Sequence, residues 1–174
     1  PTARHPKAWR LKAVNGRTRV YYKTTTWHRY WPGGRGALAG AGQFTSTTGL
    51  VTLRTPAGDR TYRGALRYVN TDTVNVVTLE GYVKGVVPSE MPSTWLPAAL
   101  QSQAVAARTY AAFERAENLT RYYQICDTTA CQVYGGYSAE AATSNAAVDA
   151  TAGKILIFGG GPAFTQFSAS SGGW

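Results

Sequence analysis

One carboxyl group stands out among the side chains that could carry out chemistry. Glu90 is one of only nine acidic residues, and it lies in an apolar run from Gly85 to Pro92 just before the strongest predicted helix. Neighbours such as Val87 and Met91 would shield it from water, and desolvation favours the neutral form of a carboxyl group. A carboxyl group that keeps its proton is what a general acid requires. A surface glutamate in a proline-bounded turn is the alternative interpretation.

Several polar side chains could converge on this carboxyl group and bind a substrate beside it. Ordinary glycoside hydrolysis uses two carboxylates, and no second one is evident near Glu90. A lytic transglycosylase needs only one acid, because the 6-hydroxyl of the sugar itself closes a 1,6-anhydro ring and no water is consumed. Arg108 is also compatible with a supporting role or with pairing to Glu114 or Glu117. The substrate-binding candidates are Gln101, Arg108, Gln132, Tyr134, Gln166, Ser168 and Ser170.

Other catalytic patterns find little support. Both histidines, His5 and His28, lie in the N-terminal segment, far from any candidate nucleophile. The segment from Gly33 to Gly36 lacks the lysine and the following helix of a phosphate-binding loop. Aromatic and basic residues alternate around Trp27, a mixture that can stack nucleic-acid bases but also lines carbohydrate grooves and β cores. We expect no nucleic-acid partner.

The net charge of +9 is unevenly distributed along the chain. Residues 1–70 contain thirteen Lys or Arg and a single acid, Asp59, whereas residues 71–174 contain five basic and eight acidic residues. A basic first half indicates a polyanionic neighbour: nucleic acid, an anionic lipid surface or an acidic cell-wall polymer. A solvated basic β surface without a specific partner remains equally compatible with the charge.

The two cysteines, Cys126 and Cys131, are separated by four residues. Zinc would need two further ligands, and both histidines lie about a hundred residues upstream. A local disulfide fits the spacing better and indicates an oxidising, exported setting, although a reduced pair is also compatible with it. We expect neither a metal ion nor a cofactor.

The pattern of elements predicts an α+β fold with a mostly antiparallel β region. Short β-branched and aromatic runs separated by turn signals fill the first half. A short helix is predicted from Leu79 to Val86, and an alanine-rich helix behind the Glu90 loop from Pro97 to Ala116. A second long helix is expected from Ala139 to Ala152, begun by Ser138, and a hairpin over residues 154–167 follows it. The predicted strands include Val20–Tyr22, Leu50–Leu53, Ala65–Tyr68 and Val74–Val77.

Several segments occur in an order that suggests a known family. They are Glu80–Pro92, Ala99–Tyr110, residues 126–136, Asn145–Val148 and Phe164–Gly173. Together they resemble the family of the stage II sporulation protein SpoIID and the amidase enhancer LytB. The resemblance covers roughly residues 62–174 and implies a catalytic domain over residues 61–174. Residues 1–60 match much less clearly, and their charge and strand pattern predict a basic, β-rich N-terminal segment. The family pattern continues past Gly173, so we expect this domain to be truncated at its C-terminus.

The resemblance implies a secreted or envelope-associated bacterial protein that acts on peptidoglycan. Sporulation members of the family are lytic transglycosylases that cleave the MurNAc–GlcNAc bond, and the residue matching their catalytic acid is Glu90. Amidase-enhancer members imply an alternative, a non-catalytic protein that binds glycan strands and modifies a cell-wall amidase. Some relatives bind zinc through cysteines and a histidine near the block at Cys126, but this block has no histidine.

Overall fold

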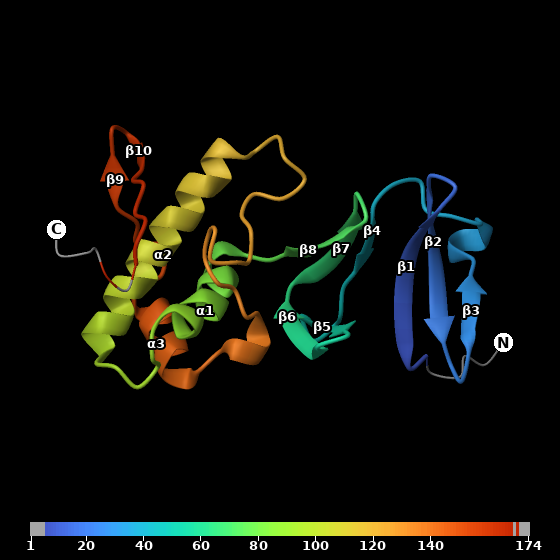
Figure 1. The fold of residues 1–174 in the computed structure, drawn as a ribbon, viewed down its shortest axis with the longest axis horizontal. Coiled ribbons are helices and arrows are strands. Elements are labelled where there is room, and N and C mark those ends of the chain that lie inside the picture. The colour runs from blue at the N-terminus through green and yellow to red at the C-terminus, as the bar shows by residue number, and fades with distance from the viewer. Residues whose placement is uncertain (1–5, 169, 171–174) are drawn as a thin grey trace.

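The computed structural model describes residues 6–168 and residue 170 (Figure 1). His5 and the end of the Phe164–Gly173 block lie outside these residues. Figure 1 shows a β unit at the N-terminal end, further strands in the middle and the helices at the other end. The strands are β1 (Ala8–Val14), β2 (Arg17–Lys23), β3 (Trp27–Tyr30), β4 (Gly42–Phe44), β5 (Leu50–Thr55), β6 (Gly58–Arg63), β7 (Ala65–Val69), β8 (Asp72–Val76), β9 (Ile157–Phe158) and β10 (Gly161–Pro162). The helices are α1 (Leu79–Glu90), α2 (Pro97–Glu117) and α3 (Ala142–Ala150), with short 3-10 turns η1 (Pro32–Gly34) and η2 (Tyr137–Ala139).

All strand pairs of the described chain are antiparallel, so the predicted α+β fold is confirmed. The sheet orders are β1-β2-β3 and β4-β7-β8, and β5-β6 and β9-β10 form two-stranded hairpins. The β1–β2 turn at Asn15 and Gly16 has positive φ at both residues, as two-residue hairpin loops require. The predicted boundary at residue 60 falls inside β6, which runs unbroken from Gly58 to Arg63.

Helix α2 presents the predicted alanine face to the core. Leu100, Ala104, Ala107 and Ala111 are all buried there, and they pack with Val83, Val86 and Val87 of α1 and Val148 of α3. Because alanine is small, the backbones of the neighbouring helices approach α2 closely. No helix in residues 6–168 is at once long enough and apolar enough to cross a membrane.

Helix α1 is longer than the sequence pattern indicated. It begins at Leu79, where the Thr78 side chain accepts a hydrogen bond from the Gly81 N–H, and it continues past Val86 to Glu90. Pro88 lies in its final turn and does not end it. The expectation that Glu90 occupies a loop ahead of α2 is therefore wrong, since Glu90 is the last residue of α1.

The C-terminal elements are shorter than predicted. Helix α3 begins at Ala142 and ends at Ala150, and Ser138 is not its cap, because its hydroxyl accepts a hydrogen bond from the Thr61 N–H at 2.8 Å. Gly153 follows α3 with a φ of 72°, as expected of a residue that ends a helix. The hairpin is present, but each of its strands has only two residues.

One close approach joins α1 to the loop that precedes η2. A Cβ added at Gly85 would lie 2.5 Å from Cε2 of Tyr134 and 3.1 Å from the Gly136 carbonyl oxygen. The Gly85 carbonyl also accepts a hydrogen bond from the Gly135 N–H at 3.1 Å. The missing side chain at Gly85 therefore allows the loop to lie directly on the helix.

We expect Gly85→Ala to destabilise the protein by about 1–3 kcal/mol, because the methyl group must displace the Tyr134 ring. Alanine would otherwise stabilise the interior of a helix relative to glycine by roughly 0.5–1 kcal/mol. Urea denaturation monitored by circular dichroism measures the change. Gly161→Ala is the control, since a Cβ there meets no atom within 4 Å. Equal stability of the two variants would contradict the proposed close packing.

Candidate active site

The Glu90 carboxyl group is held at one oxygen. Its Oε1 atom accepts a hydrogen bond from the Val133 N–H at 2.7 Å, and the side chain is half-buried. Across the described residues, no other hydrogen bond and no ion pair to this carboxyl group is present. The second oxygen therefore has no hydrogen-bond or ion-pair partner among the described residues. Four other acids are instead paired with a basic side chain: Asp59, Glu80, Glu140 and Asp149.

The loop that supplies the Val133 N–H is fixed at several points. Cys126 and Cys131 form the predicted disulfide, with their Cα atoms 5.6 Å apart. The Tyr134 N–H donates to the Asp127 carbonyl at 3.3 Å, which closes the turn around the disulfide. Together with the Gly135–Gly85 hydrogen bond, these contacts set the position of the donor that anchors Glu90.

The predicted apolar surroundings of Glu90 are only partly formed. Val87 is fully buried, and Met91 packs against the core. Trp95, in contrast, is 55% exposed. Shielding from water therefore comes from the core side of α1, which leaves the carboxyl group accessible from outside.

A second carboxylate lies in the same neighbourhood. Burial raises the pKa of the Tyr82 phenol, and negative charges that include those of Glu90 and Asp127 raise it further. Tyr82 therefore stays protonated, and its hydroxyl donates to Oε1 of Gln132 at 3.1 Å. Asp127 is not among the predicted site residues, although its position directly after Cys126 in a family block is a usable signal.

A cavity of about 770 Å³ opens between β7, β8, the start of α1 and the disulfide loop. Aromatic rings contribute much of its wall, and both Asp127 and Tyr82 line it. Glu90 is not among the residues that line it. Tyr122 and Tyr123 are both more than a third exposed at this wall. The tyrosines that line the cavity are Tyr62, Tyr82, Tyr122, Tyr123 and Tyr134.

Arg108 does not lie in an open groove. Its side chain has no exposed surface, and it forms a two-fold hydrogen-bonded ion pair with Glu80 at 2.9 and 2.8 Å. Its remaining contacts go to Thr151 and to the carbonyls of Ala104, Val148 and Lys154. The predicted sugar contact is thus replaced by a structural role, and its carboxylate partner is Glu80, not Glu114 or Glu117.

Two more predicted substrate contacts are part of the buried interior. Gln132 is 1% exposed, and its amide donates to the Ala107 carbonyl at 3.3 Å. Tyr134 is also buried; it stacks on Tyr82, and its hydroxyl donates to Oδ1 of Asn75 at 2.7 Å. Burial raises the pKa of the Tyr134 phenol. Both residues hold the loop against α1, and Tyr134 also forms part of the cavity wall.

The remaining candidates lie at the surface or close to it. Gln101 is half-buried on α2, whereas Gln166 and Ser168 are exposed. The Ser168 hydroxyl donates to the Ser170 carbonyl at 2.8 Å. Within the described part of the chain, no hydrogen bond connects these side chains to Glu90. Their substrate contacts remain predictions.

Comparison with known proteins identifies the family. The model of the stage II sporulation protein (SpoIID) family matches residues 67–158, which is more than half of the chain. The chain belongs to the SpoIID family. The matched region contains α1 with Glu90, α2, the disulfide loop with Val133, and α3. Strands β1 to β6 lie outside it.

Curated relatives agree with this family. The amidase enhancer of Bacillus subtilis (strain 168) is 45% identical over 92 residues, which cover 53% of this chain and 12% of the relative. The stage II sporulation protein D of the same organism is 32% identical over 145 residues, covering 74% of this chain and 41% of the relative. The chain thus spans less than half the length of either relative. No solved structure matches the chain significantly.

Zinc does not fit the site of this SpoIID-family chain. The sulfur atoms that would bind it are bonded to each other in the Cys126–Cys131 disulfide. Within residues 6–168, no three His, Cys, Asp or Glu side chains gather closely enough to hold a metal ion.

Glu80 makes the stability of this region depend on pH. Burial opposes its ionisation, but hydrogen bonds from Arg108 and the Gly153 N–H outweigh burial and lower the pKa of Glu80. A lowered pKa stabilises the folded state above the carboxyl group's ordinary pKa of about 4.5, and this stabilisation is lost as the pH falls through the folded-state pKa.

We expect Glu80→Gln to lower the free energy of unfolding at pH 7 by roughly 2–4 kcal/mol, because it leaves the buried Arg108 guanidinium without a counter-charge. The difference from the wild type should begin to shrink below about pH 4.5, where Glu80 of the unfolded chain takes up a proton, and it should vanish once the pH falls below the lowered folded-state pKa. Urea denaturation at pH 7 and pH 3.5 measures both values. A difference that stays constant between these pH values would contradict the ion pair.

Proposed function

We propose that this chain is a lytic transglycosylase of the bacterial cell wall, with Glu90 as its general acid and base. The observation that carries the proposal is the Glu90 carboxyl group, anchored through Oε1 to the Val133 N–H with its second oxygen free of partners in the described residues. Membership of the SpoIID family supports a role in cell-wall metabolism, and so does the similarity to an amidase enhancer.

The proposed reaction uses Glu90 twice. The protonated carboxyl group first gives its proton to the oxygen that links MurNAc to GlcNAc, and the bond between C1 of MurNAc and that oxygen breaks. The carboxylate then removes the proton of the 6-hydroxyl of the same MurNAc, whose oxygen bonds to C1. The products are a GlcNAc end with a free hydroxyl group and a 1,6-anhydroMurNAc end, and Glu90 regains its proton.

The geometry around Glu90 suits a residue that transfers protons at a fixed point. Glu90 is the last residue of α1, and its Oε1 atom accepts the hydrogen bond from the Val133 N–H at 2.7 Å. This backbone donor holds the carboxyl group in one orientation.

The cavity lined by five tyrosines is the proposed binding region for the glycan strand, because flat aromatic faces suit the apolar faces of sugar rings. The Cys126–Cys131 disulfide supports an extracytoplasmic, secreted or envelope-associated location, where disulfides persist. The proposed substrate is the peptidoglycan glycan strand.

The alternative function is a non-catalytic enhancer that binds glycan strands or a cell-wall amidase. One observation favours it. Over the matched region the chain is 45% identical to an amidase enhancer, compared with 32% to a stage II sporulation protein D over a longer region. The two functions use the same surface and differ in whether the Glu90 carboxyl group reacts.

We expect Glu90→Gln to reduce the formation of anhydro-ended glycan products by at least about 100-fold, because glutamine cannot transfer the proton. Mass spectrometry of peptide-free glycan strands incubated with each protein measures these products. Glu117→Gln, an exposed carboxyl group at the end of α2, is the matched control and should retain activity. If wild type and Glu90→Gln both yield no products yet increase the activity of a cell-wall amidase equally, the enhancer function is correct.

We expect Asp127→Asn to form anhydro-ended products at a rate within about tenfold of the wild type, because transglycosylation needs a single carboxyl group, whereas hydrolysis needs two. The same mass spectrometry distinguishes the outcomes. Reducing-end products from the wild type, lost in Asp127→Asn, would instead identify a hydrolase with Asp127 as its second carboxylate.

A further inference from the structure

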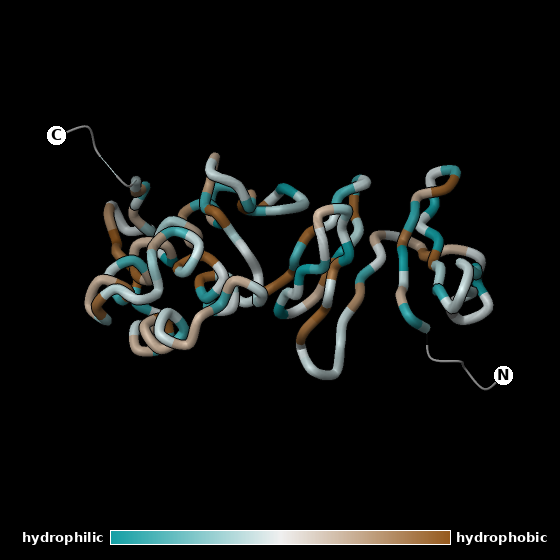
Figure 2. The backbone as a smooth tube through the Cα atoms, turned by 60° about the horizontal axis from the view of Figure 1, so that its bottom comes forward, coloured by the Kyte–Doolittle hydropathy of each residue, from teal (hydrophilic) through white to brown (hydrophobic). Residues whose placement is uncertain are grey.

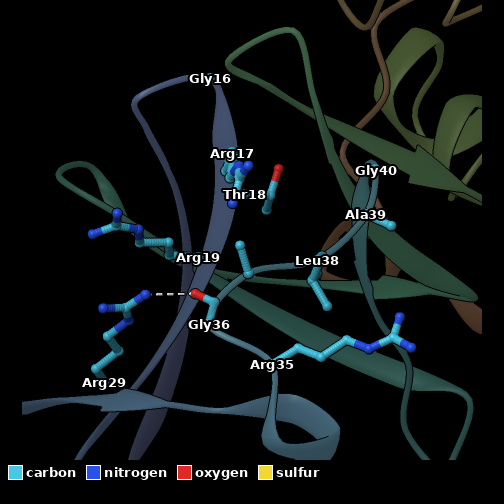
Figure 3. A pocket seen from close by; sticks show the side chains of 11 residues that line it. Gly16, Arg17, Thr18, Arg19, Arg29, Arg35, Gly36, Leu38, Ala39 and Gly40 are labelled. Atoms are coloured by element: carbon cyan, nitrogen blue, oxygen red, sulfur yellow. Dashed lines mark hydrogen bonds between the residues drawn. The ribbon is translucent and has the colours of Figure 1, made fainter.

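A second pocket lies in the N-terminal β unit, outside the family-matched region. It has a volume of about 500 Å³ and is enclosed by β2, the end of β3 and the segment from Arg35 to Gly40. Figure 3 shows arginine side chains on both sides of this segment. The four arginines that line the pocket are Arg17, Arg19, Arg29 and Arg35.

The positive charge of this pocket has no nearby counter-charge. No acidic side chain lines it, and the only acid in residues 1–70, Asp59, is paired with Arg54 on the β5–β6 hairpin. Figure 2 shows hydrophilic residues recurring along the backbone of the β1–β3 unit. Like charges brought together repel one another unless an anion lies between them.

Two of the arginines are positioned by the fold. Arg29 of β3 lies opposite Tyr21 of β2. Arg19 lies two residues before Tyr21 along β2, so Arg19 and Arg29 are diagonal neighbours in the sheet. Its Nη2 donates to the Gly36 carbonyl at 2.6 Å (Figure 3). Its guanidinium also lies over the Trp31 ring, 4.0 Å from the ring centroid. These contacts hold the Arg29 guanidinium in place before any ligand arrives.

The same two side chains have unsatisfied donors. The Nε atoms of Arg19 and Arg29 are shielded from solvent, and neither has a hydrogen-bond partner. Buried donors without acceptors are costly, and structures that contain them usually place an acceptor there. An oxyanion that approaches the edge of a guanidinium accepts from Nε and Nη2 together.

We propose that this pocket binds a phosphate group. Phosphate offers several oxygen atoms in a tetrahedral arrangement, which suits guanidinium forks that approach from different strands. The phosphate belongs either to a phosphodiester chain, such as an anionic wall polymer, or to free inorganic phosphate. The exposed side chains of Arg17 and Arg35 leave the pocket open to a chain. The polymer source rests on the proposed cell-wall function, whereas phosphate binding itself does not.

The test compares variants of equal net charge. In the pocket variant Arg19→Lys/Arg29→Lys, the charge stays at +9 but the forked donors are lost. The control Arg60→Lys/Arg121→Lys changes two exposed arginines outside the pocket. Isothermal titration calorimetry at 0.15 M salt measures binding of inorganic phosphate and of poly(glycerol phosphate). We expect the pocket variant to bind about tenfold more weakly or worse, and the control to bind like the wild type.

The two probes distinguish the sources of the phosphate. If the wild type binds poly(glycerol phosphate) much more tightly than inorganic phosphate, the ligand is a phosphodiester chain. If the affinity per phosphate is equal, the ligand is the free ion. Either result supports the proposed phosphate site when the pocket variant binds more weakly. Equal binding by the wild type and the pocket variant overturns the proposal, because only diffuse charge then attracts the anion. A wild type that binds neither probe overturns it as well.

Two controls separate this result from folding and from catalysis. Thermal denaturation tests whether the pocket variant folds. If the pocket variant does not fold, the variant Arg17→Lys/Arg35→Lys replaces it. The side chains of Arg17 and Arg35 are exposed and make no hydrogen bond or ion pair in the described chain. Cleavage of peptide-free glycan strands should be unchanged in either pocket variant. A loss of phosphate binding with intact cleavage therefore supports the pocket independently of the proposed enzyme activity.

Discussion

The arrangement of the three helices depends on one buried guanidinium. Arg108 projects from the middle of α2 and binds Glu80 at the start of α1, the last turn of α3 and the Lys154 carbonyl beyond it. An alanine-rich interface packs closely but gives little directional preference, because methyl groups are nearly alike. The hydrogen bonds of Arg108 fix the relative orientation of the helices. Any other orientation would separate Arg108 from its partners and leave a buried group unsatisfied. The angle of α1, and with it the position of Glu90, follows from this network.

The candidate site is built from backbone atoms as much as from side chains. Gly85 allows the loop to approach α1, the Gly135 N–H binds the Gly85 carbonyl, and one turn further along α1 the Val133 N–H meets Glu90. A donor that belongs to the backbone cannot rotate away, so the carboxyl group stays oriented without a second charged residue. This explains how a site with so few charged groups can hold its acid in place.

The sequence indicated some of these features and not others, for identifiable reasons. The alanine face of α2 and the disulfide followed from periodicity and spacing, which depend on local structure. The sequence pattern predicts Arg108, Gln132 and Tyr134 as ligands or supporting residues because polar residues near a catalytic motif suit a groove or a buried network equally well, and only burial distinguishes the two. The pairing of Glu80 with Arg108 was not predicted, because it joins segments 28 residues apart in the chain. The length of α1 was underestimated because proline is tolerated in a final helical turn.

The two ends of the molecule differ in whether their basic side chains are paired with carboxylates, and this difference affects how the two ends could act together. In the helical part, Lys84 and Arg108 each pair with a carboxylate, and Arg63 of β6 pairs with Glu140 beside that part. The β1–β3 unit has no acidic residue with which to pair its charges. Because salt screens charges beyond about 8 Å at physiological ionic strength, the basic unit acts on anions near its own surface and hardly at Glu90. The proposed binding of an anionic polymer and the proposed cleavage of a glycan strand can therefore change independently.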